Sequence, residues 1–482
     1  MESLITVYLP VGVGTFHMET AADQFARSVR LLKSIDGDVV VPDRPLLSVE
    51  ALRDYLAPLR PGLVIFQDLT FANGAYMAEV LRRYDGPVLL WTLREPAGDG
   101  GRLKLNSLTG AYSAAHTLRN FGNRPFSYVF GAPEEENVRE AVQKAIRAAA
   151  DESVTSLLDE KPEEREKTPE EVFAASIRDK MRRLKIAAVG HTPQGFGFGR
   201  ALDAEMMYNF GAELVSVEVR ELINKAKSYA DEECAEYLAR TEEATCGFGK
   251  TPEKNRLDHA RLYKAYTDFV RENGIGALAS RCWPDLFTEF GTPVCTVLSL
   301  LNDEGVAAAC EADLYGALSM WIGQELSGRP VFFGDPVALD EEANTLTFWH
   351  CGMAACSLAR RDTGAVVGVH PNRKIGPAMD FGCESFPSAT IFRIGREPDG
   401  TFRFFIAEGE ALDRPKQFIG TSLVVRTDAD SRALVEQSVA AGFEPHFAVI
   451  HGRHAGTLKA LAGLYGFKVC EYPLPEEGDR QN

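Results

Sequence analysis

The apolar run LITVYLPVGVG (4–14) and the segment METAADQFARSVRLLKSI (18–35) that follows it are the first indication of the fold. The first run is typical of a buried strand, and the second has the apolar spacing of an amphipathic helix. The alternation continues through further apolar runs (36–42, 62–68, 86–93, 126–131) and predicted helices (47–58, 74–84, 113–122). This pattern predicts a parallel sheet covered by helices on both faces.

A charged segment, 151–172, separates this region from a second one with the same texture. We interpret it as a solvated helix and linker, and therefore as a domain boundary. The second α/β unit begins with the predicted strand LKIAAVG (184–190), which leads into the Gly-rich loop HTPQGFGFG (191–199). Neither unit contains a complete dinucleotide-binding fingerprint, since GVGTF (12–16) is only a fragment of one.

From about residue 330 the pattern changes to short strands separated by Gly, Pro and Asp, as in NTLTFWH (344–350) and TFRFFIAEG (401–409). This texture predicts an antiparallel-rich, β-barrel-like domain. The expected fold class is α/β, with two N-terminal doubly wound domains (1–165 and 166–330) and a C-terminal β-rich domain (331–482).

The composition excludes several classes of function. The chain has 482 residues, and 52 basic against 69 acidic side chains give a net charge of −17. That acidity argues against a nucleic-acid partner and against an anionic membrane surface. No apolar run is long enough to span a bilayer, and the N-terminus lacks the basic region of a signal peptide.

The nine cysteines have no framework spacing, which fits reduced thiols in a cytoplasmic protein. Cys351 and Cys356 lack a second pair, so we do not expect a structural zinc site.

Two carboxylates are candidates for chemistry. Glu311 lies in CEADLYGALSM (310–320), on a helix that we expect to span 307–326, and its small apolar neighbours suggest burial. A buried carboxylate must be paired, hydrogen-bonded or bound to a metal. The alternative is an acid in a first helical turn, stabilised by the helix dipole. Asp313 is expected on the opposite side of that helix, as a structural hydrogen-bond acceptor.

Asp335 ends the apolar run of PVFFGDP (330–336), 24 positions after Glu311. An Asp before Pro at a strand end is commonly a turn former, which is the alternative reading. A helix, a turn and a strand fit in the interval and would bring the two carboxylates together.

Two histidines complete a mixed oxygen and nitrogen set. His446 stands at the start of a predicted strand and His350 at the end of another, where a packing or surface role is the alternative. Such a set suits Mn²⁺, Mg²⁺ or Co²⁺ better than tetrahedral zinc, because no thiolate belongs to it.

Several segments, in this order along the chain, together resemble the L-fucose isomerase and L-arabinose isomerase superfamily. They are PVLLWTLREP (87–96), LKLNSLTGAYSAAHTLRNFG (103–122), SRCWPDLFTEFG (280–291), CEADLYGALSMWIGQELSGRPVFFGDP (310–336) and HFAVIHGRHAGTLKALAGLYG (446–466). The resemblance implies that Glu311 and Asp335 bind Mn²⁺ and act as the acid/base pair, with His446 as a further ligand. His350 resembles an additional histidine ligand of the arabinose isomerases, whereas Pro445 replaces an Asn that is common in the fucose enzymes.

The resemblance also implies a homo-oligomer, a trimer or hexamer, in which the N-terminal domain of a neighbouring subunit completes the active site. His17 in GTFHME (14–19) resembles an arabinose-isomerase segment and is the candidate residue donated in this way. A helix-capping role at the surface is the alternative for His17.

Other candidate substrate contacts follow predicted strands, where ligand sites of α/β proteins occur. Trp283 is interpreted as an apolar wall, and Arg281 as a contact to a hydroxyl or an anion, with core packing and a surface ion pair as the alternatives. The loop after 184–190 offers Gln194 or His191, while Trp91 is expected to pack in the core.

The predicted function is a metal-dependent aldose–ketose isomerase that acts on a pentose or (deoxy)hexose through an enediolate. The alternatives are a sugar-binding or regulatory protein without catalysis, and another metal-dependent sugar or sugar-acid epimerase or lyase.

Overall fold

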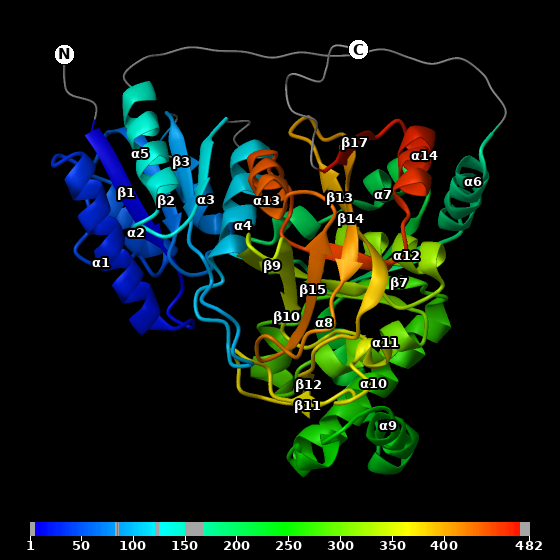
Figure 1. Cartoon of the computed structure of the whole chain (residues 1–482). Helices are drawn as coiled ribbons and strands as arrows, with labels where there is room; N and C mark the ends of the chain where they lie inside the picture. Colours follow the sequence, from blue (N-terminus) through cyan, green and yellow to red (C-terminus); the bar gives the residue numbers. More distant parts are fainter. Residues whose placement is uncertain (1–4, 82–83, 85, 121–124, 150–166, 473–482) are drawn as a thin grey trace.

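The protein is described by a computed structural model that covers residues 5–81, 84, 86–120, 125–149 and 167–472. The structure is a mixed α/β protein with two parallel sheets and a third, mixed sheet (Figure 1). Most of the predicted linker, 151–166, lies outside the described residues, and the next described helix is α6 (Pro169–Met181). None of the described helices has the length and apolarity needed to cross a membrane.

The first sheet has the order β1-β2-β3-β4, and all of its strands are parallel. Its strands are β1 (Ile5–Val11), β2 (Pro61–Asp68), β3 (Val88–Thr92) and β4 (Ser127–Phe130). Segment 36–42, which was predicted to be a strand, forms only a single bridge between Val40 and Val7. It follows that the run of three valines is too short to extend the sheet.

Helices cover both faces of this sheet, as the alternation predicts. One face packs against α2 (Val49–Leu56), α3 (Gly74–Leu81) and α4 (Ser107–Asn120). The other face packs against α1 (Met18–Ile35) and α5 (Glu136–Ala148). Strand side chains alternate between the two clusters, so that Val64 and Phe66 face one side while Leu63 and Ile65 face the other.

The second sheet has the order β6-β5-β7-β8, again all parallel. Its strands are β5 (Lys185–Val189), β6 (Glu213–Val217), β7 (Ala277–Ser280) and β8 (Ala307–Cys310). The order reverses at β5, because β6 pairs on one side of it and β7 on the other. The crevice outside the strand carboxyl ends at such a reversal is where ligands bind in open α/β sheets.

The helices of this part of the chain are α7 (Asp203–Phe210), α8 (Val219–Ser228), α9 (Asp231–Ala244), α10 (Glu253–Asn273), α11 (Cys295–Asp303) and α12 (Leu314–Ser327). The predicted helix 307–326 is therefore wrong at its start. Residues 307–310 form β8, and the helix begins only at Leu314. The three consecutive alanines before Cys310 are compatible with a helix or a strand, and the pairing of this segment with β7 makes it a strand.

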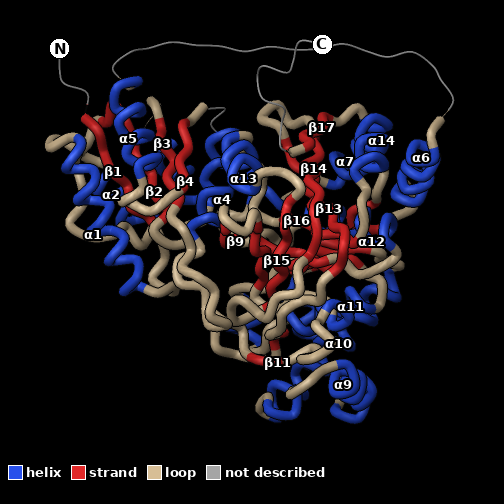
Figure 2. Tube along the Cα trace, viewed as in Figure 1, coloured by secondary structure: helices blue, strands red, loops and turns tan. Residues whose placement is uncertain are grey.

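The third sheet contains seven strands in the order β13-β16-β9-β10-β15-β14-β17 (Figure 2). They are β9 (Phe332–Asp340), β10 (Thr345–His350), β13 (Phe386–Arg396), β14 (Phe402–Ala411), β15 (Thr421–Thr427), β16 (Phe447–His451) and β17 (Lys468–Glu471). All pairings are antiparallel except that of β14 with β17, and β13 also pairs with β14. The antiparallel-rich prediction for this region is thereby confirmed.

The remaining elements are the small hairpin of β11 (Val367–Gly368) with β12 (Ala378–Met379) and the helices α13 (Ser431–Ala440) and α14 (Ala455–Tyr465). The first and third sheets join through α4, where the Tyr112 hydroxyl hydrogen-bonds Ser438 and the Tyr112 ring meets Phe447 edge-on. This contact brings the loops of the first sheet over the carboxyl ends of the second.

Candidate active site

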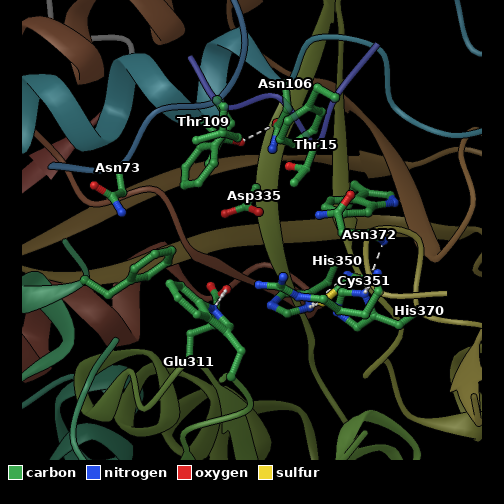
Figure 3. Close-up of a pocket in the computed structure, with 17 residues that line it drawn as sticks. Thr15, Asn73, Asn106, Thr109, Glu311, Asp335, His350, Cys351, His370 and Asn372 are labelled. Atoms are coloured by element: carbon green, nitrogen blue, oxygen red, sulfur yellow. Dashed lines mark hydrogen bonds between the residues drawn. The ribbon is translucent and has the colours of Figure 1, made fainter. Parts of the chain in front are cut away.

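A cavity of about 290 Å³ lies where the three sheets meet (Figure 3). The second and third sheets contribute Trp283, Glu311, Asp335, Trp349 and His350. The loops after the strands of the first sheet and the first turn of α4 cover it with Val13, Thr15, Phe16, Phe71, Asn73, Asn106 and Thr109. Side chains from all three sheets of one chain therefore line the cavity.

Glu311 occupies the turn between β8 and α12, not a helix. Both Glu311 and Ala312 have left-handed backbones, with φ of 57° and 53°. Two successive non-glycine residues in this region are strained, and such strain is concentrated at functional sites. The Ala312 N–H donates to the Ser280 carbonyl at 3.0 Å, and this bond holds the turn against the end of β7. As a result Glu311 points into the cavity, where Trp283 Nε1 donates to its Oε1 at 3.3 Å.

Asp335 lies within β9, which continues through Pro336, so its predicted position at a strand end is wrong. Pairing with β10 shifts register between Thr347 and Phe348, and this bulge accommodates Pro336, which lacks an N–H for the ladder. Asp335 is paired with Trp349, one residue before His350 at the end of β10. The sheet thus places Asp335 and His350 at the same end of adjacent strands.

The predicted ligand set converges on one point. Ligand atoms of Glu311, His350 and His446 all lie within 4.8 Å of one another. His446 Nε2 is 3.1 Å from Glu311 Oε2 and 3.5 Å from Asp335 Oδ1. Asp335 Oδ1 and His350 Nε2 are buried and have no hydrogen-bond partner in the described part of the chain. Such unsatisfied buried donors and acceptors, arranged as oxygen and nitrogen ligands, fit a divalent cation.

The electrostatics of the site also favour a cation. The pKa of Asp335 is raised overall to about 7, mainly by burial and to a smaller extent by the charge of Glu311, although His446 and His350 oppose the rise. Burial lowers the pKa of His446, yet the hydrogen bond that its ring donates to Asp313 and the charge of Asp335 raise it overall to about 10. The shift of His446 reflects the carboxylates around its ring, and the shift of Asp335 reflects above all its burial. A bound divalent ion would offset the negative charge of the carboxylates and keep them ionised.

A contact with Asp313 at Nδ1 holds the His446 ring in place. Its Nδ1 lies 2.9 Å from Asp313 Oδ2, and Arg393 Nη2 donates to the other oxygen of Asp313 at 3.0 Å. Asp313 also caps α12, since its Oδ1 accepts from the Gly316 N–H. Burial opposes ionisation of Asp313, but the Arg393 charge and the His446 hydrogen bond hold its pKa well below the usual value. The expectation that Asp313 accepts structural hydrogen bonds is confirmed, but its expected place on the opposite side of a helix from Glu311 is wrong, because both precede α12 and contact the His446 ring.

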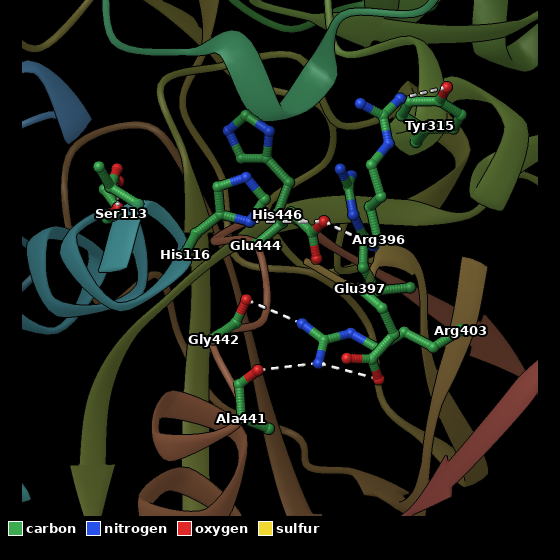
Figure 4. Close-up of polar contacts among 12 residues, drawn as sticks. Ser113, His116, Tyr315, Arg396, Glu397, Arg403, Ala441, Gly442, Glu444 and His446 are labelled. Atoms are coloured by element: carbon green, nitrogen blue, oxygen red, sulfur yellow. Dashed lines mark hydrogen bonds and ion pairs between the residues drawn. The ribbon is translucent and has the colours of Figure 1, made fainter. Parts of the chain in front are cut away.

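A second network fixes the segment that leads into β16 (Figure 4). The Arg403 guanidinium donates to the carbonyls of Ala441 and Gly442 at 2.8 and 2.9 Å. The Arg396 N–H donates to the Glu444 carboxylate at 3.0 Å. These bonds anchor residues 441–444, so the backbone just before His446 has little freedom.

The other predicted contacts lie away from the described cavity lining. Arg281 pairs with Asp285 at 2.7 Å and donates to the Trp283 carbonyl. Gln194 is exposed, and its carbonyl accepts from Asn73 Nδ2. His17 is the N-cap of α1, where its Nδ1 accepts from the Thr20 N–H. Trp91 is buried and donates to the Gly131 carbonyl, as expected for a core residue, and the His191 side chain is 75% exposed.

Sequence reasoning missed the polar residues of the first sheet's loops. Asn106 has a left-handed backbone (φ 55°) and accepts from the Thr109 hydroxyl at 2.7 Å. The Glu95 carboxylate accepts from the backbone N–H groups of residues 104–106 and so shapes this loop. Asn73 also faces the cavity. Their position after predicted parallel strands was the signal that would have indicated them.

The loop between β11 and β12 was also missed. It contributes His370, Asn372 and Arg373 to the lining. Ligand atoms of Cys295, Cys351 and His370 lie within 4.8 Å of one another, forming a second group of metal-ligating side chains beside the first. The four-residue spacing of Cys351 and Cys356 did not reveal it, because the neighbours of Cys351 come from other elements. All nine cysteines are free thiols.

The chain is an aldose–ketose sugar isomerase, because proteins with that activity match it from end to end. A sulfoquinovose isomerase of Clostridium sp. (strain MSTE9) is 56% identical over 472 residues, which is 98% of this chain and all of that protein. Sulfoquinovose isomerases of Priestia aryabhattai and Alkalicoccus urumqiensis are 35% and 34% identical over 98% and 97% of the chain and 100% and 99% of those proteins. The chain therefore belongs to the sulfoquinovose isomerase family. No family model matches it.

Proposed function

We propose that this enzyme interconverts sulfoquinovose, a glucose-type aldose with a sulfonate on carbon 6, and the corresponding 2-ketose. The substrate follows from the names of the relatives. The observation that carries the chemistry is the convergence of Glu311, His350 and His446, with Asp335 beside them, at one cavity. We also assign the chain to the L-fucose and L-arabinose isomerase superfamily, whose expected acid/base and ligand positions are these residues.

We propose that Glu311, Asp335, His446 and His350 hold one Mn²⁺ ion, with Mg²⁺ or Co²⁺ as substitutes. Such an ion acidifies the C–H bond next to a carbonyl and stabilises the enediolate, as a Lewis acid does. The unsatisfied Asp335 Oδ1 and His350 Nε2 support this assignment.

The residues of the chain would divide the remaining work. Glu311 and Asp335 form the acid/base pair: one takes the proton from C2 of the open-chain aldose and returns it to C1. The hydroxyl proton moves from O2 to O1, so no atom or electron is gained or lost. Trp283 supports one side of the sugar, and Asn73, Asn106 and Thr109 are placed to hydrogen-bond its hydroxyls.

We further propose three domains with boundaries near residues 165 and 330, each built on one of the three sheets. Pairing of β13 with both β16 and β14 supports a barrel-like third domain, because it joins the two ends of a six-stranded series. A cytoplasmic homo-oligomer remains our prediction, in which the exposed N-cap residue His17 would face a neighbouring subunit.

The test is NMR of sulfoquinovose with the purified enzyme and Mn²⁺ in D₂O. We expect the ketose to accumulate and deuterium to appear at C1 or C2. Treatment with EDTA should abolish turnover, and added Mn²⁺ should restore it. Cleavage of the carbon chain, or conversion to an epimeric aldose alone, would replace the isomerase with a lyase or an epimerase. Full activity after rigorous metal removal would contradict the metal site.

A further inference from the structure

Among the described residues that line the cavity, Arg373 is the only lysine or arginine. In the described parts of the chain, no hydrogen bond or ion pair engages its guanidinium, whereas neighbouring arginines are all occupied. Arg281 pairs with Asp285, and Arg102 donates to the Thr15 carbonyl and to Asn372. An unpaired guanidinium at an otherwise acidic and apolar cavity is available to an anionic ligand.

Two aromatic rings orient the Arg373 side chain. Its guanidinium carbon lies 5.7 Å from the ring centroids of both Trp283 and Phe287. Both distances are within the range of cation–π attraction. The guanidinium is thus held against two faces while its N–H edges stay free, which suits a planar fork that binds oxyanions.

Hydrogen bonds also fix the backbone around Arg373. His370 Nδ1 accepts from the N–H groups of Asn372 and Arg373, both at 3.3 Å. The Lys374 N–H donates to the His370 carbonyl at 2.9 Å, and Arg102 holds the Asn372 side chain at 2.6 Å. This is a hydrogen-bonded turn that presents Arg373 at a defined place on the cavity wall.

Trp283 connects this turn with the catalytic carboxylate. Its indole N–H donates to Glu311, while Arg373 lies over its ring. Trp283 therefore contacts both the reacting carboxylate and the cation of the cavity. A sugar with its carbonyl carbon at Glu311 would direct its far carbon along Trp283 toward Arg373.

The charges of the cavity also favour a sugar whose far carbon lies at Arg373. A bound divalent ion would neutralise the carboxylates of Glu311 and Asp335. Arg373 would then give the cavity one net positive charge, which complements a monoanionic sugar. The chain carries a net charge of −17, which repels anions. An anionic sugar therefore needs a local positive charge such as that of Arg373. On the basis of the function proposed above, we propose that Arg373, on the 370–375 turn, binds the C6 sulfonate and selects sulfonated over neutral sugars.

The experiment compares Arg373→Gln with the wild-type enzyme, both loaded with Mn²⁺. We expect KM for sulfoquinovose to rise about 10- to 100-fold, because a hydrogen-bonded charge is lost. Inhibition by quinovose, the same sugar with a methyl group in place of the sulfonated carbon, should stay unchanged. Lys374→Gln is the matched control, since it removes an exposed charge from the next residue, which does not line the cavity.

Each outcome decides a separate point. An unchanged KM in Arg373→Gln, or an equal loss in Lys374→Gln, would overturn the sulfonate site while leaving the isomerase function intact. A parallel loss of quinovose inhibition or Mn²⁺ affinity would reduce Arg373 to a structural support for Trp283, and would also overturn it. A wild-type enzyme that does not convert sulfoquinovose would instead refute the proposed substrate.

Discussion

Asp313 Oδ2 contacts Nδ1 of His446 at 2.9 Å, while Nε2 of the same ring faces Glu311 at 3.1 Å. The carboxylate therefore fixes the ring so that Nε2 points to the proposed metal position. Carboxylates behind histidine ligands orient the ring and increase its basicity. Arg393, itself fully buried, neutralises Asp313 from the other side.

Asp313→Asn should weaken Mn²⁺ binding about 10- to 100-fold, the usual effect of removing such a partner. It should also lower the melting temperature, because a buried arginine left without its carboxylate costs about 3–5 kcal/mol. Mn²⁺ titration followed by EPR, and thermal melting of the metal-free protein, separate the two effects.

Asp380→Asn serves as the control, because Asp380 pairs with Lys416 away from His446. It should lower stability modestly and leave Mn²⁺ affinity unchanged. Normal Mn²⁺ affinity in Asp313→Asn would show that the contact with His446 is only structural.

Glu311→Gln should reduce turnover by about 10²- to 10⁴-fold, as expected when a general base is removed. Gln has the same shape, and the left-handed backbone at this position is as costly for either residue, so the melting temperature should change little. Deuterium incorporation measured by NMR reports the proton transfer directly. Glu304→Gln, at a surface pair with Arg240, should retain full turnover; equal activity in both variants would remove Glu311 from the mechanism.

The parallel sheets could be predicted from the sequence because their strands are continuous apolar runs between amphipathic helices. The position of Glu311 could not, because Ala307–Cys310 suits a helix as well as a strand and only pairing with β7 settles it. Asp335 was mistaken for the end of a strand for a similar reason: a bulge lets β9 continue through Pro336.

The candidate site was predicted where residue chemistry is distinctive and missed where only geometry reveals it. Carboxylates and histidines stand out in an apolar context, so Glu311, Asp335, His350 and His446 could be selected and the structure brings them together. Asn106 and Arg373 resemble ordinary loop residues in the sequence. Contacts across distant segments, such as Arg373 over Trp283, bring them to the cavity.

His350→Ala should weaken Mn²⁺ binding at least as strongly as loss of the Asp313 contact, because it removes a proposed ligand atom. His350 Nε2 has no hydrogen-bond partner in the described structure, so its loss should act on the metal, while the bond that Nδ1 accepts from the Cys351 N–H is lost as well. Isothermal titration with Mn²⁺ measures the change. His191→Ala, at a largely exposed histidine, is the control; the same affinity in both variants would leave His350 outside the ligand set.

Stability should fall in mild acid because of His259. Its ring is fully buried, with Nε2 2.9 Å from the Thr241 hydroxyl, and burial lowers its pKa to about 3. An unfolded histidine has a pKa of about 6.5. Below that pH the unfolded chain binds a proton that the folded chain excludes, so stability present above pH 6.5 is lost as the pH falls toward 3.

At pH 5 the loss from this residue should reach about 2 kcal/mol, as 1.36 kcal/mol per pH unit implies. His259→Gln cannot titrate, so its melting temperature should decline less between pH 7 and pH 5 than that of the wild-type protein. His191→Gln, at an exposed position, should keep the wild-type slope. Parallel slopes for the wild type and His259→Gln would mean that His259 becomes protonated without unfolding, through an opening of the packing around Phe248, whose ring meets it edge-on at 5.4 Å.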